Sequence, residues 1–322
     1  MPDFQETSHA SQKLVELLNN KVFGQSEIIE HIVVAVICNE HALLTGAPGV
    51  AKTTLVRNLA SALGNKYKRI QFTPDLTPFD ILGGDTIQFD EKDPNFKKIV
   101  FTPGPIFSPF IIADEINRAS PRTQSALLEA MQERQVSIGG ISRALPSPFY
   151  VFATQNPIEN EGTFPLPEAQ LDRFLLNLDI PYPDFDSEVK IASLPKKMED
   201  LSLVPFANTL LNSRETVENI SISKELLNGV VRIIRNTRPQ ESKLNVAKEY
   251  LDFGASPRAT QALLIASKAI ALLRGKTEVQ FEHIAEMAPA VLRHRCIMNF
   301  RSHTEKRSSS NIINQIVQET IL

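Results

Sequence analysis

Over its first 184 residues the chain alternates short apolar runs with segments whose apolar positions recur every three or four residues. Five of the runs have the length of buried strands: Ala42–Thr45, Arg69–Phe72, Phe110–Ala113, Phe149–Thr154 and Phe174–Ile180. Strands that alternate with helices are typical of a mostly parallel sheet covered by helices on both faces. Because each run is largely apolar, we expect all five strands to be buried on both sides. The pattern therefore predicts an α/β fold for this part of the chain.

Several helix ends are marked by residues with known capping preferences. Ser120 is a predicted N-cap that is followed by Pro121, and Pro167 opens another helix, which Arg173 ends. Ser223 is the predicted N-cap of a helix in the second half of the chain. These signals place helices between and after the predicted strands.

Residues 181–184 form the best predicted linker, because two prolines flank a single residue there. Beyond this linker the strand signals nearly vanish and amphipathic helices dominate. One long helix opens at Ser256-Pro257 and is rich in alanine and leucine. We therefore predict two domains, an α/β core over residues 1–184 and a helical domain over residues 185–322.

Composition narrows the class of protein. With 322 residues and 42% hydrophobic positions, the chain is long enough for two hydrophobic cores. No apolar run approaches the roughly 18 residues of a membrane span. Two cysteines, Cys38 and Cys296, cannot build a disulfide framework, and no cysteine or histidine pair has the spacing of zinc ligands. We therefore expect a cytoplasmic protein with no membrane span and no structural metal.

Charge is distributed unevenly along the chain. The formal net charge is −3, yet acidic residues outnumber basic ones in residues 1–184 and the reverse holds in residues 185–322. A slightly acidic chain is not typical of a dedicated nucleic-acid binder, so we do not expect nucleic acid as the partner. Two oppositely charged halves would favour a head-to-tail contact between copies of the chain.

A glycine-containing loop follows the first predicted strand and precedes a helix. It reads Gly46-Ala47-Pro48-Gly49-Val50-Ala51-Lys52-Thr53. Such a loop directs backbone N–H groups at a phosphate, the lysine neutralises the β and γ oxygens, and the threonine hydroxyl reaches Mg²⁺. Ala51 stands where the common phosphate-loop motif has its last glycine. A Gly-Pro loop that merely caps a helix is the alternative.

Two adjacent carboxylates, Asp114 and Glu115, end the third predicted strand. At the carboxyl edge of a parallel sheet, Asp114 could hold Mg²⁺ through water and Glu115 could polarise an attacking water. A strand end with two solvated acids is the alternative, and the phosphate loop upstream makes it the weaker interpretation.

Three further polar residues carry chemistry in this interpretation. Asn156 follows the fourth strand, where a neutral amide can orient the attacking water, although a turn-forming asparagine is the alternative. Arg173 ends a helix, and Arg258 lies in the first turn of another, where a cation opposes the helix dipole. Such a cation suggests an anionic partner such as a phosphate, whereas a structural ion pair is the commoner use of an arginine.

Two hairpins are predicted within the first half. Gln135–Leu145 contains two short alternating runs joined by Gly139-Gly140, which is a strong hairpin signal. A second possible hairpin spans Thr86–Val100, with its turn around Asp93-Pro94-Asn95. The first hairpin either contacts a partner or only covers the edge of the sheet, and the sequence assigns no role to the second.

Taken in order, these motifs resemble the MoxR family of AAA+ ATPases. The resemblance extends from about residue 20 to residue 300 and rests on Val22-Phe23-Gly24-Gln25, Gly46–Thr53, Phe101–Pro105, Asp114–Arg118, Met131–Val136, Asn156, Leu171–Phe174 and Ser256-Pro257-Arg258. Alanine is usual at the position of Ala51 in this family. The resemblance implies an αβα core with a parallel five-stranded sheet, followed by a C-terminal helical lid.

The resemblance also implies ATP and Mg²⁺ as cofactors and a role for each site residue. The nucleotide would be held by Val22 and Phe23 at the adenine and by Gly46, Pro48, Gly49, Val50, Ala51, Lys52, Thr53 and Thr54 in the Walker A loop. Thr53 and Asp114 would hold Mg²⁺, with Glu115 as general base, Asn156 as sensor 1, Arg173 as the arginine finger given to the neighbouring subunit and Arg258 as sensor 2.

The family implies Mg²⁺-dependent ATP hydrolysis coupled to remodelling, maturation or activation of a protein partner. Its members usually form hexameric rings, and the resemblance favours a client that carries a von Willebrand factor A domain. Two alternatives remain open. The protein could be a nucleotide-gated scaffold with slow hydrolysis, or a DNA-directed motor, which the acidic core disfavours.

Overall fold

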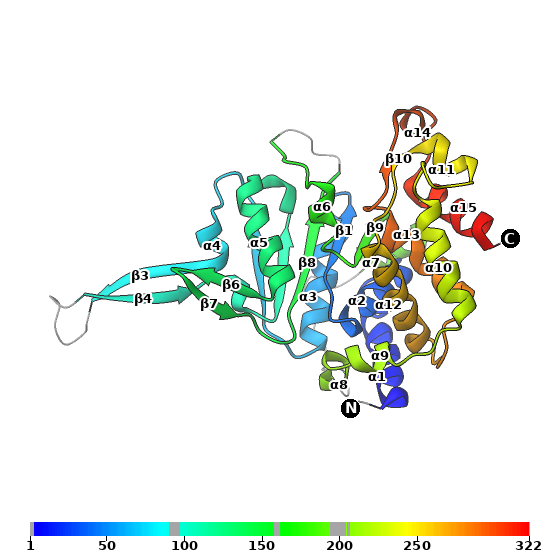
Figure 1. Ribbon diagram of the computed structural model, residues 1–322. Coiled ribbons are helices and arrows are strands. Elements are labelled where there is room, and N and C mark those ends of the chain that lie inside the picture. Colours follow the sequence, from blue (N-terminus) through cyan, green and yellow to red (C-terminus); the bar gives the residue numbers. More distant parts are fainter. Residues whose placement is uncertain (1–2, 90–96, 158–161, 194–203, 205–206, 322) are drawn as a thin grey trace.

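A five-stranded parallel sheet forms the centre of the computed structural model, which describes residues 3–89, 97–157, 162–193, 204 and 207–321. The strand order is β2-β5-β8-β1-β9 (Figure 1). The strands are β1 (Ala42–Gly46), β2 (Tyr67–Gln71), β5 (Phe110–Asp114), β8 (Tyr150–Gln155) and β9 (Leu176–Ile180). All five predicted strands are confirmed, each with its ends within two residues of the prediction.

Burial differs between the middle of this sheet and its edge. Every residue of β5 is buried, because the strand has neighbours on both sides and helices on both faces. At the edge, β2 exposes Lys68, Arg69 and Gln71 and buries only Ile70. The expectation of burial on both sides is therefore wrong for β2, since an edge strand with three long polar side chains leaves them in solvent.

Helices of the first half cover both faces of the sheet and form a three-layer core (Figure 1). One face buries Leu44 and Ile112 with the helices α2 and α3, and the other buries Leu43 and Ile111 with α5. The helices are α1 (Phe4–Asn19), α2 (Ser26–Ile37), α3 (Lys52–Ala62), α4 (Pro78–Leu82), α5 (Pro121–Glu133) and α6 (Glu168–Leu171). Short 3-10 turns cover Pro105–Phe107 and Ile116–Arg118.

The predicted capping residues stand close to where they were expected. The Ser120 hydroxyl accepts a hydrogen bond from the Thr123 amide at the start of α5, and the Ser223 hydroxyl accepts one from Leu226. Pro167 is itself the N-cap of α6, which ends at Leu171. The expectation that this helix continues to Arg173 is wrong, because the chain turns after Leu171 to enter β9.

The second half is mainly helical, which confirms the predicted helical lid. Its helices are α7 (Phe185–Ala192), α8 (Ala207–Leu211), α9 (Arg214–Glu218), α10 (Lys224–Asn236), α11 (Asn245–Tyr250), α12 (Arg258–Leu273), α13 (Phe281–Leu292), α14 (Phe300–Thr304) and α15 (Ser309–Ile321). It also holds a small antiparallel pair, β10 (Leu251–Phe253) and β11 (Ile297–Met298). Helix α12 packs against α1 and α2, so one hydrophobic core continues from the first half into the second.

Two hairpins extend from the sheet on the side away from the helical half (Figure 1). They are β3 (Gly83–Phe89) with β4 (Lys97–Pro103), and β6 (Gln135–Ile138) with β7 (Ile141–Ala144). The Gly139-Gly140 turn is confirmed, with φ of +60° and +76°, as a type I′ hairpin requires. The second hairpin is also confirmed as a strand pair, while its predicted turn at Asp93-Pro94-Asn95 lies outside the described residues.

Side chains on the long hairpin are unusually apolar for exposed positions. Ile87 and Ile99 lie opposite each other and are 63% and 71% exposed. The guanidinium of Arg143, on the short hairpin, lies 3.9 Å from the centre of the Phe101 ring on the long one. This cation–π contact joins the two hairpins into one projecting unit.

In the described part of the chain, no helix is both long enough and apolar enough to cross a membrane, and no three histidine, cysteine or acidic side chains gather as metal ligands. Cys38 and Cys296 are both free and buried.

Candidate active site

The carboxyl ends of β1, β5 and β8 meet at one edge of the sheet. In the parallel register Ala113 pairs with Ala153, which places Asp114 beside Thr154. Leu44 pairs with Thr154 from the other side, so the loop after β1 begins at the same edge. The sheet alone therefore brings together the glycine-containing loop, the carboxylates after β5 and the polar residues after β8.

The loop from Gly46 to Ala51 leads into α3 without a side-chain cap. The N-cap residue is Ala51, whose side chain makes no capping hydrogen bond. These N–H groups, aligned with the helix dipole, form a ready anion site. Lys52 Nζ donates to the carbonyl oxygens of Ala47, at 3.0 Å, and Gly46, so the lysine lies against the loop.

Other loop residues have structural reasons for their identity. A Cβ at Gly46 would lie 2.7 Å from the carbonyl oxygen of Ile180, which excludes any larger residue there. Val50 is buried and anchors the loop, whereas Pro48 is exposed and Thr54 is half-buried on the first turn of α3. Gly46 and Val50 thus fix one side of the loop against the protein, and the side at Pro48 is open to solvent.

Ala51 adopts the left-handed conformation, with φ +63° and ψ +18°. Because an L side chain disfavours this region, we expect Ala51→Gly to raise the free energy of unfolding by about 0.5–1 kcal/mol. Denaturant titration measures the change. Ala60→Gly, inside the same helix, is the matched control and should lower stability by about 1 kcal/mol or more. Equal losses from the two substitutions would contradict the strain at Ala51.

Thr53 and Asp114 meet at the start of α3. The Thr53 hydroxyl lies 3.3 Å from Asp114 Oδ1 and 3.2 Å from Oδ2, and the Thr154 hydroxyl donates to Oδ1 at 2.6 Å. A hydroxyl and a carboxylate are the oxygen donors that Mg²⁺ prefers, usually with water between. The two groups are close enough to serve one ion, so the residues present fit a magnesium site beside the anion site.

Arg69 also reaches Asp114, which the sequence analysis did not foresee. Its Nε and Nη2 atoms donate to Asp114 Oδ2 at 2.9 and 2.6 Å. The parallel register pairs Gln71 with Asp114, and Arg69 lies two residues earlier, on the same face of β2. A basic residue two positions before the end of an edge strand was the only signal in the sequence.

Glu115 follows Asp114 in a left-handed backbone conformation, with φ +57° and ψ +50°. Its amide donates to the Thr154 hydroxyl at 2.9 Å, so that hydroxyl links both acidic residues. Its carboxylate accepts a hydrogen bond from Gln71 Nε2 at 2.9 Å and lies 3.3 Å from Arg118 Nε. The turn directs the second carboxylate away from the strand and holds it at the open edge.

Asn156 lies directly after β8 and is buried. Since β8 is the neighbour of both β1 and β5, this amide lies between the loop and the two carboxylates. The structure therefore places it where a polar group could contact a terminal phosphate or its attacking water.

Arg173 lies away from this edge, near the end of α5. Its Nε donates to the Gln132 side-chain oxygen at 2.9 Å, and in the described ranges no carboxylate pairs with it. The preceding residue, Asp172, is held by Arg295 Nε at 2.6 Å. Arg295 is almost completely buried, and burial lowers its pKa while Asp172 opposes that shift. Among the described residues, Arg173 is thus a cation without a carboxylate partner, on a firmly anchored segment.

The remaining predicted residues lie in the N-terminal and helical parts. Arg258 is exposed at the first position of α12 and forms no ion pair with any described residue. Val22 is buried and Phe23 half-buried, immediately before Gly24, whose φ is +74°.

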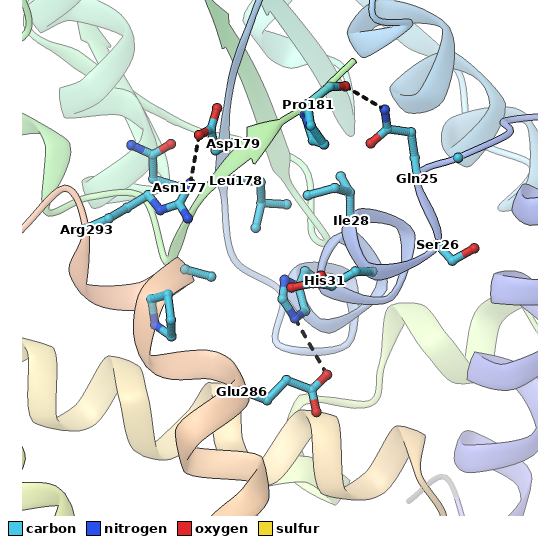
Figure 2. A pocket seen from close by; sticks show the side chains of 14 residues that line it. Gln25, Ser26, Ile28, His31, Asn177, Leu178, Asp179, Pro181, Glu286 and Arg293 are labelled. Atoms are coloured by element: carbon cyan, nitrogen blue, oxygen red, sulfur yellow. Dashed lines mark hydrogen bonds and ion pairs between the residues drawn. The ribbon is translucent and has the colours of Figure 1, made fainter. Parts of the chain in front are cut away.

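A pocket of about 330 Å³, lined by both polar and apolar side chains, lies between α2, β9 and α13 (Figure 2). Gln25 donates to the carbonyl oxygen of Pro181 at its upper end, and His31 lies 3.7 Å from Glu286 at the other. Val22 and Phe23 do not line this pocket, whose wall begins at Gly24. The predicted adenine contacts therefore stay a prediction.

Comparison with known proteins gives a consistent set of matches. Residues 41–176 match the model of the ATPase family associated with various cellular activities, and residues 244–316 match that of the AAA lid domain. The chain is 39% identical to the chaperone MoxR1 of Mycobacterium tuberculosis, over 98% of this chain and 82% of that protein. It is 39% identical to the uncharacterized protein YeaC of Bacillus subtilis, over 95% of this chain and 92% of that protein. A crystal structure from Cytophaga hutchinsonii, of a protein proposed to be an ATPase, superposes with a TM-score of 0.86. The two sequences are 37% identical, and the match covers 98% of this chain and 96% of the other.

Proposed function

This chain belongs to the MoxR family of AAA+ ATPases, and we propose that it hydrolyses ATP with Mg²⁺ in order to remodel or activate a protein partner. One observation carries the proposal. The Thr53 hydroxyl and the Asp114 carboxylate lie 3.2–3.3 Å apart at the N-terminus of α3, where the N-cap residue Ala51 makes no side-chain capping bond. This arrangement supports a phosphate site with a magnesium site beside it, as hydrolysis of a nucleoside triphosphate requires.

Each residue has a distinct task in the proposed reaction. The amides at the start of α3 bind the β- and γ-phosphates, and Lys52 exchanges its loop carbonyls for phosphate oxygens. Thr53 and Asp114 would hold Mg²⁺, which when bound neutralises charge on the phosphates. Glu115 accepts a proton from the attacking water, and Asn156 orients that water.

Assembly into a ring supplies the remaining cation. Arg173 lies beyond α6 against the neutral amide of Gln132, so its charge is available to a neighbouring copy. An arginine brought to the transferring phosphoryl group from outside stabilises its charge in the transition state. We propose a homo-oligomeric ring, hexameric as is usual in the family, in which Arg173 completes the next subunit's site. Arg258, exposed at the start of α12, would supply a second cation.

The hairpins are the proposed contact with the client. Ile87 and Ile99 expose an apolar pair on the long hairpin, and Ile141 is 58% exposed on the short one. Exposed aliphatic side chains on a projecting unit suit transient contact with a polypeptide. The relative from Mycobacterium tuberculosis is named a chaperone, which supports a protein client. A protein with a von Willebrand factor A domain is the client that we favour.

Phosphate release from purified protein tests this function. We expect hydrolysis of ATP that stops when Mg²⁺ is chelated, and a specific activity that rises with protein concentration as rings form. Analytical ultracentrifugation at the same concentrations should show the oligomer. Tight ATP binding without phosphate release, in the assembled protein and with candidate clients present, would overturn the proposal in favour of a nucleotide-gated scaffold.

A further inference from the structure

Arg69 contacts Asp114, the carboxylate that the proposed magnesium site needs. Arg69 donates two hydrogen bonds, at 2.9 and 2.6 Å, to a single oxygen of Asp114, while Thr154 donates to the other oxygen. Asp114 is the Mg²⁺-holding carboxylate of the proposed function, so this inference rests on that function. In the structure this acid is therefore already neutralised by a side chain of the protein.

The two partners differ in their exposure to solvent. The Asp114 side chain is 9% exposed, whereas that of Arg69 is 53% exposed. A carboxylate at that depth needs a counter-charge, because an unpaired buried charge is strongly unfavourable. The guanidinium, in contrast, can rotate from the edge strand into water at small cost. Arg69 is thus the partner that can leave.

Arg69 and Mg²⁺ compete electrostatically for this position. A divalent ion at Asp114 would lie within a few ångströms of a guanidinium that contacts the same carboxylate, and like charges at such a distance repel strongly even near a protein surface. The carboxylate oxygens are already committed to Arg69 and to the hydroxyl of Thr154. Metal binding is therefore disfavoured while Arg69 remains on Asp114.

Withdrawal of Arg69 would also affect Gln71, a partner of the second carboxylate. Arg69 Nη2 donates to the Gln71 side-chain oxygen at 2.6 Å, and the Gln71 amide nitrogen donates to Glu115 at 2.9 Å. The bond from Arg69 fixes which end of the Gln71 amide faces Glu115. Once Arg69 leaves, Gln71 loses that restraint, while Glu115 keeps its contacts with Gln71 and Arg118.

We propose that Arg69 is an internal counter-ion that closes the magnesium site of the nucleotide-free protein, and that Mg²⁺ arriving with nucleotide must displace it. Arg69 is a positioning residue, since it acts through Asp114. The protein thereby keeps its buried acid paired until metal and nucleotide are both present.

The direct test measures the Mg²⁺ requirement for nucleotide binding, without hydrolysis. MgCl₂ is titrated into protein mixed with a fluorescent ADP analogue, for wild type, Arg69→Gln and Arg69→Lys. We expect the half-saturating Mg²⁺ concentration of Arg69→Gln to fall by about tenfold, because the competing charge is gone. Arg69→Lys keeps the charge but loses the paired hydrogen bonds, so its value should lie between the other two.

Lys68→Gln is the matched control. It removes the same charge from the neighbouring exposed position of β2, and successive strand residues point to opposite faces. Its Mg²⁺ requirement should equal that of wild type. A general effect of net charge would move both variants together and would overturn the inference.

Thermal melting separates the proposed role from a purely structural one. We expect Arg69→Gln to melt below wild type when no Mg²⁺ or nucleotide is present, and to gain more from MgADP than wild type does. An equal deficit with and without MgADP, or an unchanged or higher Mg²⁺ requirement, would make Arg69 a simple brace between β2 and β5. A wild-type protein without Mg²⁺-dependent nucleotide binding would overturn the proposed function as well.

Discussion

We expect Glu115→Gln to retain ATP binding and to lose hydrolysis. The substitution keeps the shape of the side chain and its place at the end of β5, but a neutral amide cannot accept a proton from water. Removal of a positioned general base typically costs a factor of about 10²–10⁴ in kcat. Phosphate release and equilibrium binding of a fluorescent ATP analogue, measured on the same preparation, separate the two effects.

Glu129→Gln provides the matched control for this variant. Glu129 is an exposed acid on α5, so the same chemical change there should leave kcat within about twofold of wild type. A Glu115→Gln protein that hydrolyses ATP at the wild-type rate would show that another group activates the water. A variant that no longer binds ATP would show that Glu115 holds the nucleotide instead.

Arg173→Ala should also lower kcat strongly, but for a different reason. The substituted subunit keeps its own phosphate loop, Thr53 and Asp114, so its affinity for ATP should change little. What it loses is the cation that it offers to the next site, and an arginine finger is worth a factor of about 10³–10⁵ in kcat. Steady-state phosphate release at protein concentrations above assembly measures the loss.

Mixing the two inactive variants tests whether the arginine acts between subunits. A Glu115→Gln subunit still offers Arg173, and an Arg173→Ala subunit still has Glu115. Mixed rings therefore contain some complete sites, and we expect activity to return on mixing and subunit exchange. If mixtures stay inactive although both variants assemble, Arg173 acts within its own subunit. If each variant alone is fully active, the assignment of both residues is wrong.

Local signals in the sequence predicted much of the fold. Ser120 and Ser223 cap their helices because a hydroxyl satisfies an otherwise unpaired amide, and that depends on a few adjacent residues. The turn at Gly139-Gly140 follows from two residues that tolerate positive φ. The pattern of strands and helices also indicated which residues end strands, and so placed Asp114 and Asn156 at one edge.

What the sequence did not predict depends on pairings between distant segments. Arg69 reaches Asp114 only because β2 and β5 are parallel neighbours in a particular register, and a one-residue shift would turn the arginine to the other face. The exposure of β2 is a different case, because the polar side chains of Lys68, Arg69 and Gln71 are themselves typical of an edge strand. The anchor between Asp172 and Arg295 joins residues more than a hundred positions apart.

That anchor links the helical lid to the segment that carries Arg173. Arg295 follows α13 and donates to Asp172 and to the carbonyl oxygen of Phe174, on either side of Arg173. A rotation of the lid that moved α13 would therefore also move Arg173. In the proposed ring, the position of one subunit's lid would thus affect the site of the neighbouring subunit.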